Sequence, residues 1–328
     1  LAGGTQTCTP MLPNSAESDL VFVTGSATAT IASTVNNATL TSITGAQVMQ
    51  FTIRDGGSDF TDADAVPTIL TGFTLSQGAG NQVTTWSDAI LAISLFDGAT
   101  KLADGVISAS TVVFSGFSAS TGTDGGSKTL TIRLSLKCPL GADAFDGEDF
   151  VFSITNANTT FSVSGSGKTT FPVVSNPNDT TNVISVTATR LFFSSQPIST
   201  GVNTAMSNVV VKAIDACGNT DLSFVGSISL NSSGTMTGEP VLLTATSGVA
   251  TYIGLTHTVV GTNLTMTATS TGLTSAISSN FDISNITVLT KGDLAILAVN
   301  TAADATGSGD ELSFVCFKDI LPGTQLFF

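Results

Sequence analysis

Residues 130–136 read LTIRLSL, so that apolar and polar side chains alternate along them. This period of two places the apolar side chains on one face of an extended chain, which is typical of a β-strand with one buried face. Residues 208–214, NVVVKAI, have the same character, and similar runs recur between short stretches rich in Gly, Asn, Asp and Ser. No helix-forming residues keep a 3.6-residue spacing over three turns. The sequence therefore predicts an all-β fold.

The spacing of these runs predicts tandem β-sandwich domains. A chain of 328 residues is too long for one ordinary sandwich. Strand-like runs with Asp-Gly turns at residues 55–57, 97–98, 104–105 and 124–126 fill its first half, and about seven short runs follow at the size of an immunoglobulin-like sandwich. The predicted domains are an N-terminal arm at 1–18, a large β-sandwich at 19–187, an Ig-like β-sandwich at 188–284 and the beginning of a third, incomplete β unit at 285–328.

The composition excludes several classes of function. The net charge is −14, and only ten residues are Lys or Arg, so the chain lacks the basic clusters that phosphate binding needs. We therefore expect no nucleic acid partner. No apolar stretch reaches the about 20 residues of a membrane span, and we expect no membrane insertion. The acidity fits either plain solubility or the binding of divalent cations.

The two ends of the chain suggest export and a longer protein. The chain begins at Leu1 without a charged segment before an apolar run, so we expect a cleaved signal peptide and an extracellular or cell-surface location. The last three residues, Leu326–Phe328, are an apolar run with no turn after it. We expect the sequence to be the front part of a longer protein.

Four cysteines occur, and none lies in a CxxC motif. An even number in an exported chain predicts two disulfides, for which three connectivities exist. We predict Cys8–Cys138, which would tie the arm to a strand of the first domain, and Cys217–Cys316, which would clamp the second domain to the unit after it. The alternative is four buried free thiols.

Two acidic clusters are candidate calcium sites. Ca²⁺ takes six to eight oxygen ligands, which loops between strands supply readily. Solvated acidic loops are the alternative, and nothing in the sequence places the two clusters across a cleft as glycoside hydrolysis would require. The clusters are Asp55, Asp59, Asp62 and Asp64, and Asp143, Asp146, Glu148 and Asp149.

The chain has one His, one Trp and one Tyr, which limits its chemistry. A Ser-His-Asp triad would have to use His257, which lies in a strand-like run without a Gly-x-Ser-x-Gly elbow, so we predict a structural histidine. Trp86 and Tyr252 could form a platform for a sugar ring. Tyr252 falls in an alternating core pattern, however, and a lone Trp is usually a packing residue, so we predict that both are structural.

Three segments resemble parts of known bacterial surface proteins. The motifs AIDACGN at 213–219, GVATYIGL at 248–255 and SNFDI at 279–283 resemble filamin- or invasin-like Ig repeats. QFTIRDGG at 50–57 and LTIRLSLKCPLG at 130–141 are similar to N-terminal modules of large Bacteroidota cell-surface proteins. The segment that begins KGDLAILAVN at 291–300 looks like the opening of another domain common in those proteins.

The resemblance implies export by the type IX route and a role as adhesin, surface filament or display stalk. The sorting domain of such cargo is absent, which again implies a longer protein. Cysteine is unusual in these motifs, and Cys217 and Cys316 lie on either side of a domain junction, which favours their pairing. Asp179-Thr180-Thr181 resembles the O-glycosylation triplet of Bacteroidota, with Thr180 as the acceptor.

Together these observations predict a non-enzymatic extracellular structural or adhesive protein that assembles into a filament or layer. Its expected partners are copies of itself, other surface proteins or glycans, and calcium is the one cofactor that the sequence suggests. Two alternatives remain. The domains are the non-catalytic stalk of a larger secreted hydrolase, or they form a carbohydrate-binding module.

Overall fold

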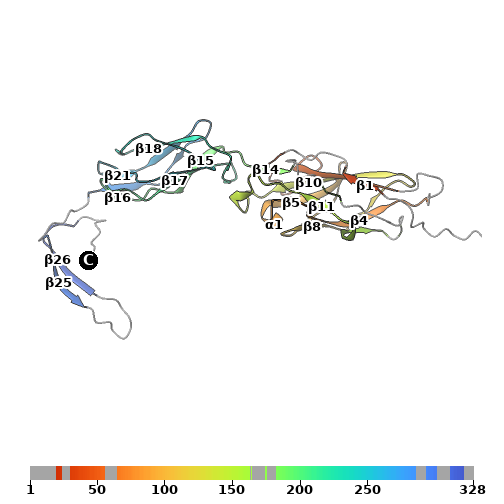
Figure 1. Cartoon of the computed structure of the whole chain (residues 1–328), viewed down its shortest axis with the longest axis horizontal. Helices are drawn as coiled ribbons and strands as arrows, with labels where there is room; N and C mark the ends of the chain where they lie inside the picture. Colours follow the sequence, from red (N-terminus) through yellow and green to blue (C-terminus); the bar gives the residue numbers. More distant parts are fainter. Residues whose placement is uncertain are drawn as a thin grey trace, which may run out of the picture. The chain divides into compact units, whose positions relative to one another are not determined.

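The computed structural model of the chain confirms the all-β prediction. It describes residues 20–23, 30–55, 65–162, 164, 174–175, 182–285, 293–300 and 311–320. Contacts between residues divide the chain into two compact units (Figure 1). The first unit comprises Leu1–Ala188 and Ile214–Leu222, and the second comprises Thr189–Ala213 and Ser223–Phe328.

The first unit contains a five-stranded sheet with the order β1-β3-β10-β5-β6. Its described pairings are antiparallel, and β10 lies between β3 and β5. In β10 the predicted alternation holds from Leu130 to Leu134, and it ends at Ser135, which is also fully buried and lies next to a shift in the pairing register with β5. The strands are β1 (Leu20–Val23), β3 (Ala46–Arg54), β5 (Ile90–Asp97), β6 (Thr100–Asp104) and β10 (Ser127–Leu136).

A second sheet of this unit is built around the long strand β4 (Ile69–Gln77). Its main path is β13-β11-β4-β8-β7, and two short strands, β9 and β12, also pair with β4. A parallel pair, β2 (Thr30–Ala32) with β14 (Val183–Ser185), completes the unit. The other elements are β7 (Val106–Ile107), β8 (Thr111–Phe114), β9 (Ala119–Ser120), β11 (Phe152–Ile154), β12 (Thr159–Phe161), β13 (Val174–Ser175), the helix α1 (Trp86–Ala89) and two 3₁₀ turns, Asp143–Phe145 and Asn156–Asn158.

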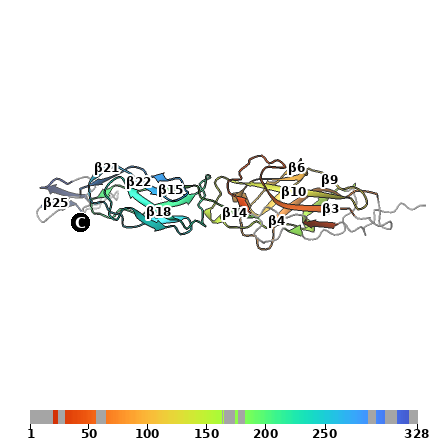
Figure 2. The ribbon, with the colours of Figure 1, turned by 90° about the horizontal axis from the view of Figure 1, so that it is seen from above.

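The two sheets form two layers, with β1 and β10 above β4 and β8 in Figure 1 and overlapping them in the view from above in Figure 2. One apolar core contains buried residues of both sheets. Phe51 of β3 meets Phe73 of β4 edge to face, with 5.5 Å between ring centroids, and Phe73 also packs on Phe114 of β8. The core also contains Trp86, whose side chain is fully buried. This is the sandwich arrangement that the sequence predicts.

Gly105 carries the chain from one sheet to the other. β6 ends at Asp104 and pairs with β5, whereas β7 begins at Val106 and pairs with β8. The Asp104-Gly105 turn that we predicted is therefore a crossing between layers. A Cβ atom on Gly105 would collide with Val112 and lie 2.8 Å from Ile93 Cγ2.

The second unit contains three small sheets, with the orders β15-β17-β20, β16-β24-β21 and β19-β18-β22-β23, and a separate hairpin of β25 and β26. Tyr252 of β20 donates a hydrogen bond to the carbonyl of Ile228 in β18, 2.7 Å away, which joins two of the sheets. The strands are β15 (Arg190–Ser195), β16 (Thr200–Gly201), β17 (Val209–Ile214), β18 (Ser227–Ser232), β19 (Val241–Thr244), β20 (Val249–Tyr252), β21 (Gly261–Leu264), β22 (Met266–Thr269), β23 (Ala276–Ile277), β24 (Phe281–Ser284), β25 (Leu294–Asn300) and β26 (Glu311–Cys316).

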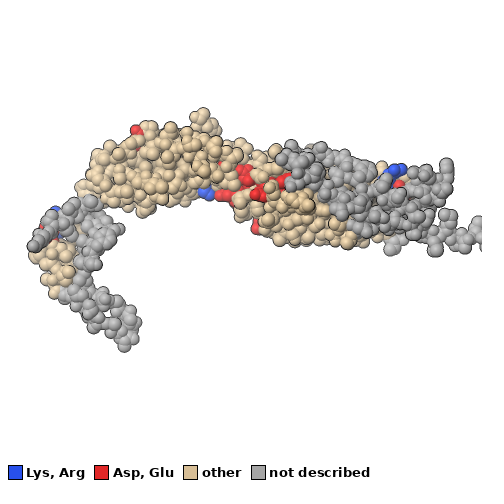
Figure 3. Space-filling model, viewed as in Figure 1, with Lys and Arg blue, Asp and Glu red and all other residues tan. Residues whose placement is uncertain are grey.

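The surface is poor in charge. On the face drawn in Figure 3, most atoms of the described residues belong to uncharged residues. The described residues form no helix that is long and apolar enough to cross a membrane.

Replacing Gly105 by alanine tests the crossing between the sheets. We expect Gly105→Ala to lower the free energy of unfolding by about 1–3 kcal/mol, because the added methyl group overpacks the core against Val112 and Ile93. Urea unfolding followed by the fluorescence of Trp86 measures this change. In the control, Gly122→Ala, the new Cβ would have ordinary contact distances, with Gly126 Cα 3.6 Å away. Equal midpoints for the two variants would contradict the packing argument.

Candidate functional site

The segment Ile214–Leu222 belongs by its contacts to the first unit, although it begins at the last residue of β17 and ends before β18, which are strands of the second unit's sheets. We call Ile214–Leu222 the returning segment. It contains the disulfide-bonded Cys217 and the buried polar residues Asp215, Asn219, Thr220 and Asp221. It is therefore the best candidate for a functional site.

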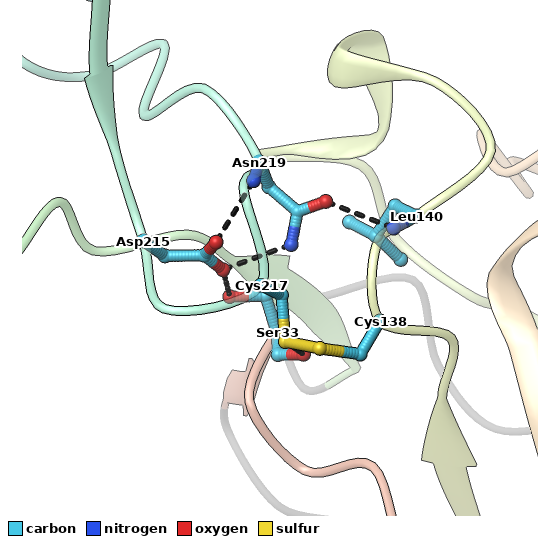
Figure 4. The surroundings of a disulfide bond; sticks show 6 residues. All are labelled: Ser33, Cys138, Leu140, Asp215, Cys217 and Asn219. Atoms are coloured by element: carbon cyan, nitrogen blue, oxygen red, sulfur yellow. Dashed lines mark hydrogen bonds between the residues drawn. A yellow bond between two sulfur atoms is a disulfide. The ribbon is translucent and has the colours of Figure 1, made fainter. Parts of the chain in front are cut away.

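A disulfide joins Cys217 of the returning segment to Cys138, which lies just after β10 (Figure 4). Their Cα atoms are 4.9 Å apart, and they are separated by 79 positions in the sequence. Closing a loop of this length removes about 4–5 kcal/mol of conformational entropy from the unfolded chain in the chain-entropy model.

Both predicted cysteine pairings are wrong. Cys138 and Cys217 bond to each other, so neither is available to Cys8 or Cys316. Cys316 is a free, exposed thiol, and Cys8 lies outside the described residues. The error arose because we assigned Cys138 and Cys217 to different domains, whereas the returning segment brings Cys217 into the first unit.

Next to the disulfide, Asp215 accepts hydrogen bonds in a fully buried position. Its Oδ2 accepts from Ser33 Oγ at 2.6 Å and from Asn219 Nδ2 at 2.8 Å, and its Oδ1 accepts from the Asn219 backbone N–H at 2.8 Å. Asn219 Oδ1 in turn accepts from the backbone N–H of Leu140 at 2.8 Å. The network thus connects the returning segment to two other parts of the first unit (Figure 4).

Two acidic residues that we predicted as calcium ligands also hold the returning segment. Asp143 accepts hydrogen bonds from the backbone N–H and the hydroxyl of Thr220, at 3.1 and 2.9 Å. Asp146 accepts from the backbone N–H groups of Leu222 and Val186, both at 2.8 Å. Hydrogen bonds to an ionised acceptor are about twice as strong as neutral ones. These carboxylates therefore act as fixed acceptors for backbone groups.

Asp55, from the other predicted cluster, has the same kind of role elsewhere in the first unit. It is fully buried, and it accepts from the N–H and hydroxyl of Thr68, both at 2.7 Å, and from the N–H of Asp124 at 2.7 Å.

The remaining predicted calcium ligands give no metal site in the part of the chain that the structure describes. Asp149 is buried and Glu148 is half-buried. No group of three or more His, Cys, Asp or Glu side chains there could hold a metal ion. Asp59, Asp62 and Asp64, together with the predicted glycosylation site Thr180, lie outside the described residues.

His257 is structural, as predicted. It is fully buried, its Nε2 lies 2.8 Å from Ser232 Oγ, and its ring packs edge-on against Phe281. A catalytic triad needs a carboxylate on the other ring nitrogen, and Nδ1 of His257 has no hydrogen-bond partner among the described residues. Burial lowers the pKa of His257, and the charge of Glu239 opposes this effect.

Trp86 and Tyr252 do not form a sugar platform, because both are buried. Trp86 Nε1 donates to Asn81 Oδ1 at 3.3 Å. Burial raises the pKa of Tyr252 to about 12. The prediction that both residues belong to the cores is confirmed.

The chain matches no family model and no curated protein. Among solved structures, it is similar to the BSP domain of a biofilm-associated protein, with 11% identity over 93% of this chain and a TM-score of 0.29. The match covers 62% of that domain structure, so the chain spans less than two thirds of it.

Two further structures show the same distant similarity. The D0–D1 domain of intimin is 13% identical to this chain, and the match covers 81% of this chain and 100% of the intimin chain, with a TM-score of 0.24. Fibronectin(III)-like modules of Clostridium thermocellum CbhA are 8% identical over 81% of this chain and 94% of their own, with a TM-score of 0.19. At these TM-scores the similarities carry no argument about activity, and the all-β fold rests on the strands and sheets themselves.

Removing the Asp215 carboxylate tests the network of the returning segment. We expect Asp215→Ala to destabilise the first unit by about 2–3 kcal/mol, because Ser33 and Asn219 lose a charged, buried acceptor. Urea unfolding followed by Trp86 fluorescence measures the loss. The control Asp97→Ala breaks a partly exposed ion pair with Lys128, for which we expect a change within about 1 kcal/mol. An Asp215→Ala midpoint equal to that of the wild type would refute the role of the network.

The buried His257 predicts a pH dependence in the second unit. The pKa of the folded state is lowered, so the unfolded chain binds a proton first as the pH falls below the ordinary histidine pKa of about 6.5. The free energy of unfolding is therefore unaffected by His257 above about pH 7. It decreases as the pH falls from about 7 towards the folded-state pKa. Urea midpoints measured over this range should show the decline in the wild type and a weaker one in His257→Gln. Parallel pH profiles would contradict this account.

Proposed function

We propose that this chain is an exported, non-enzymatic structural or adhesive protein of the cell surface. The Cys138–Cys217 disulfide carries the proposal, because disulfides form and persist in oxidising environments outside the cytosol. The sandwich core of the first unit and the low surface charge support a structural role. The resemblance of its motifs to bacterial surface proteins supports export by the type IX route.

The partner that the strand edges favour is a second copy of the chain. Exposed strand edges pair with other chains unless charges or other devices protect them. In the first unit the edge strand β6 carries Lys101 and Asp104, which form an ion pair at 3.0 Å. In the second unit the edge strand β19 has the sequence VLLT, contains no charge, and exposes 62% of Leu242. Pairing of β19 with a different edge strand of the next copy would build a filament or layer, because such a head-to-tail contact does not close as a dimer.

The two alternatives differ in their support. A carbohydrate-binding module would stack sugar rings on exposed aromatic side chains. Trp86 and Tyr252 are buried, so this alternative would have to use exposed phenylalanines such as Phe192 or Phe317. The β-sandwich domains of this chain would also suit the stalk of a larger hydrolase. That alternative differs from a structural protein only in requiring a catalytic domain in another part of the protein. Calcium in the acidic loops and glycosylation at Thr180 stay predictions.

Sedimentation velocity and negative-stain electron microscopy over a series of protein concentrations test self-assembly. We expect the wild type to form filaments or layers and Leu242→Lys to remain monomeric, because this variant adds a charge to the edge strand and also removes its exposed apolar side chain. Thr244→Lys is the matched control. Thr244 is also exposed and lies two positions further along β19, so this substitution adds the same charge but removes no large apolar side chain. We expect it to weaken assembly less. A monomeric wild type at every concentration would overturn the proposed assembly.

A further inference from the structure

The chain passes between the two units three times. It leaves the first unit after Ala188, returns at Ile214 and leaves again after Leu222. The disulfide joins Cys138, before the first passage, to Cys217, within the returning segment. The covalent path along the chain therefore has a shortcut that bypasses residues 139–216. The bypassed residues include the first two passages and the strands β11 to β17.

We infer that the Cys138–Cys217 disulfide controls, through its redox state, how far the chain can extend under tension. While the bond is intact, the residues between the two cysteines do not add to the extended length. When the oxidised chain is unfolded and pulled at its two ends, the force passes through the two sulfur atoms, and the backbone of residues 139–216 carries none. Reduction places these residues back in the force path. The inference deepens the proposed function and rests on it only in assuming that a structural or adhesive surface protein is pulled.

The disulfide is open to reduction in the folded protein. Cys138 is exposed and Cys217 is partly exposed. A thiolate of a solvent dithiol attacks one sulfur, forms a mixed disulfide with it and releases the other cysteine as a thiol. The second thiol of the reagent then displaces the first cysteine. The protein gains two thiols, and the dithiol is oxidised to a cyclic or protein disulfide.

The returning segment has hydrogen bonds that do not depend on the disulfide. Asp215 binds Ser33, and Asn219 binds the backbone of Leu140. Thr220 and Leu222 bind Asp143 and Asp146. Reduction without force therefore leaves the segment in place, and the change becomes visible only under tension.

The length that reduction adds is set by the sequence separation. The disulfide bypasses a separation of 79 positions, which at 3.3–3.6 Å per residue corresponds to roughly 260–280 Å of fully extended chain.

Single-molecule force spectroscopy of the full chain tests the inference. Handles are attached at the two ends without cysteine chemistry, and all proteins carry Cys316→Ser so that the exposed thiol cannot react. We expect the oxidised protein, once fully unfolded, to be roughly 260–280 Å shorter in contour length than the protein treated with dithiothreitol. The variant with Cys138→Ser and Cys217→Ser should give the longer value without reductant. Equal contour lengths before and after reduction would overturn the inference.

A second measurement tests access to the bond in the folded state. The native protein is incubated with dithiothreitol, and Cys138 and Cys217 are then alkylated and mapped while circular dichroism follows the β-structure. We expect both cysteines to be labelled with the spectrum unchanged. Labelling only after denaturation would overturn the redox control. Neither experiment depends on self-assembly, so a failure here is distinct from a monomeric wild type in the test of the proposed function.

Discussion

The attachment of the returning segment to the first unit is the constraint on which the account of this protein depends. One covalent bond, between Cys138 and Cys217, and a set of hydrogen bonds to buried or half-buried carboxylates hold this nine-residue segment, which begins at the last residue of β17 and ends before β18. The disulfide and the hydrogen bonds to carboxylates hold the segment in addition to the burial of Ile214. The same attachment decides which residues carry force in the oxidised chain.

The acidic residues follow a common rule in the first unit. The chain has 24 Asp and Glu residues but only ten Lys and Arg, so most carboxylates cannot be paired with a cation. Asp55, Asp143, Asp146 and Asp215 instead accept hydrogen bonds from hydroxyl and backbone N–H groups. A buried charge is tolerated only when such donors surround it. In a chain with few Lys and Arg residues, hydrogen bonds to these carboxylates take the structural role that ion pairs have in other proteins.

The sequence predicted the strands well because alternation is a local property. The runs at residues 130–136 and 208–214 became the strands β10 and β17, and the aromatic residues Trp86 and Tyr252 entered the cores. The site could not be predicted in the same way. The partner of Cys217 depends on a loop that returns to the first unit, and no local pattern reveals such a contact. The acidic clusters were visible, but their spacing cannot distinguish calcium ligands from acceptors of backbone hydrogen bonds. The motif AIDACGN was the available signal, since it contains Asp215, Cys217 and Asn219 together.

Non-reducing peptide mapping of the purified native protein tests the central claim most directly. Digestion under conditions that prevent disulfide exchange, followed by mass spectrometry, should recover the peptides of Cys138 and Cys217 as one linked species, with Cys316 alkylated. Recovery of Cys138 linked to Cys8, of Cys217 linked to Cys316, or of both Cys138 and Cys217 as alkylated thiols would contradict the account.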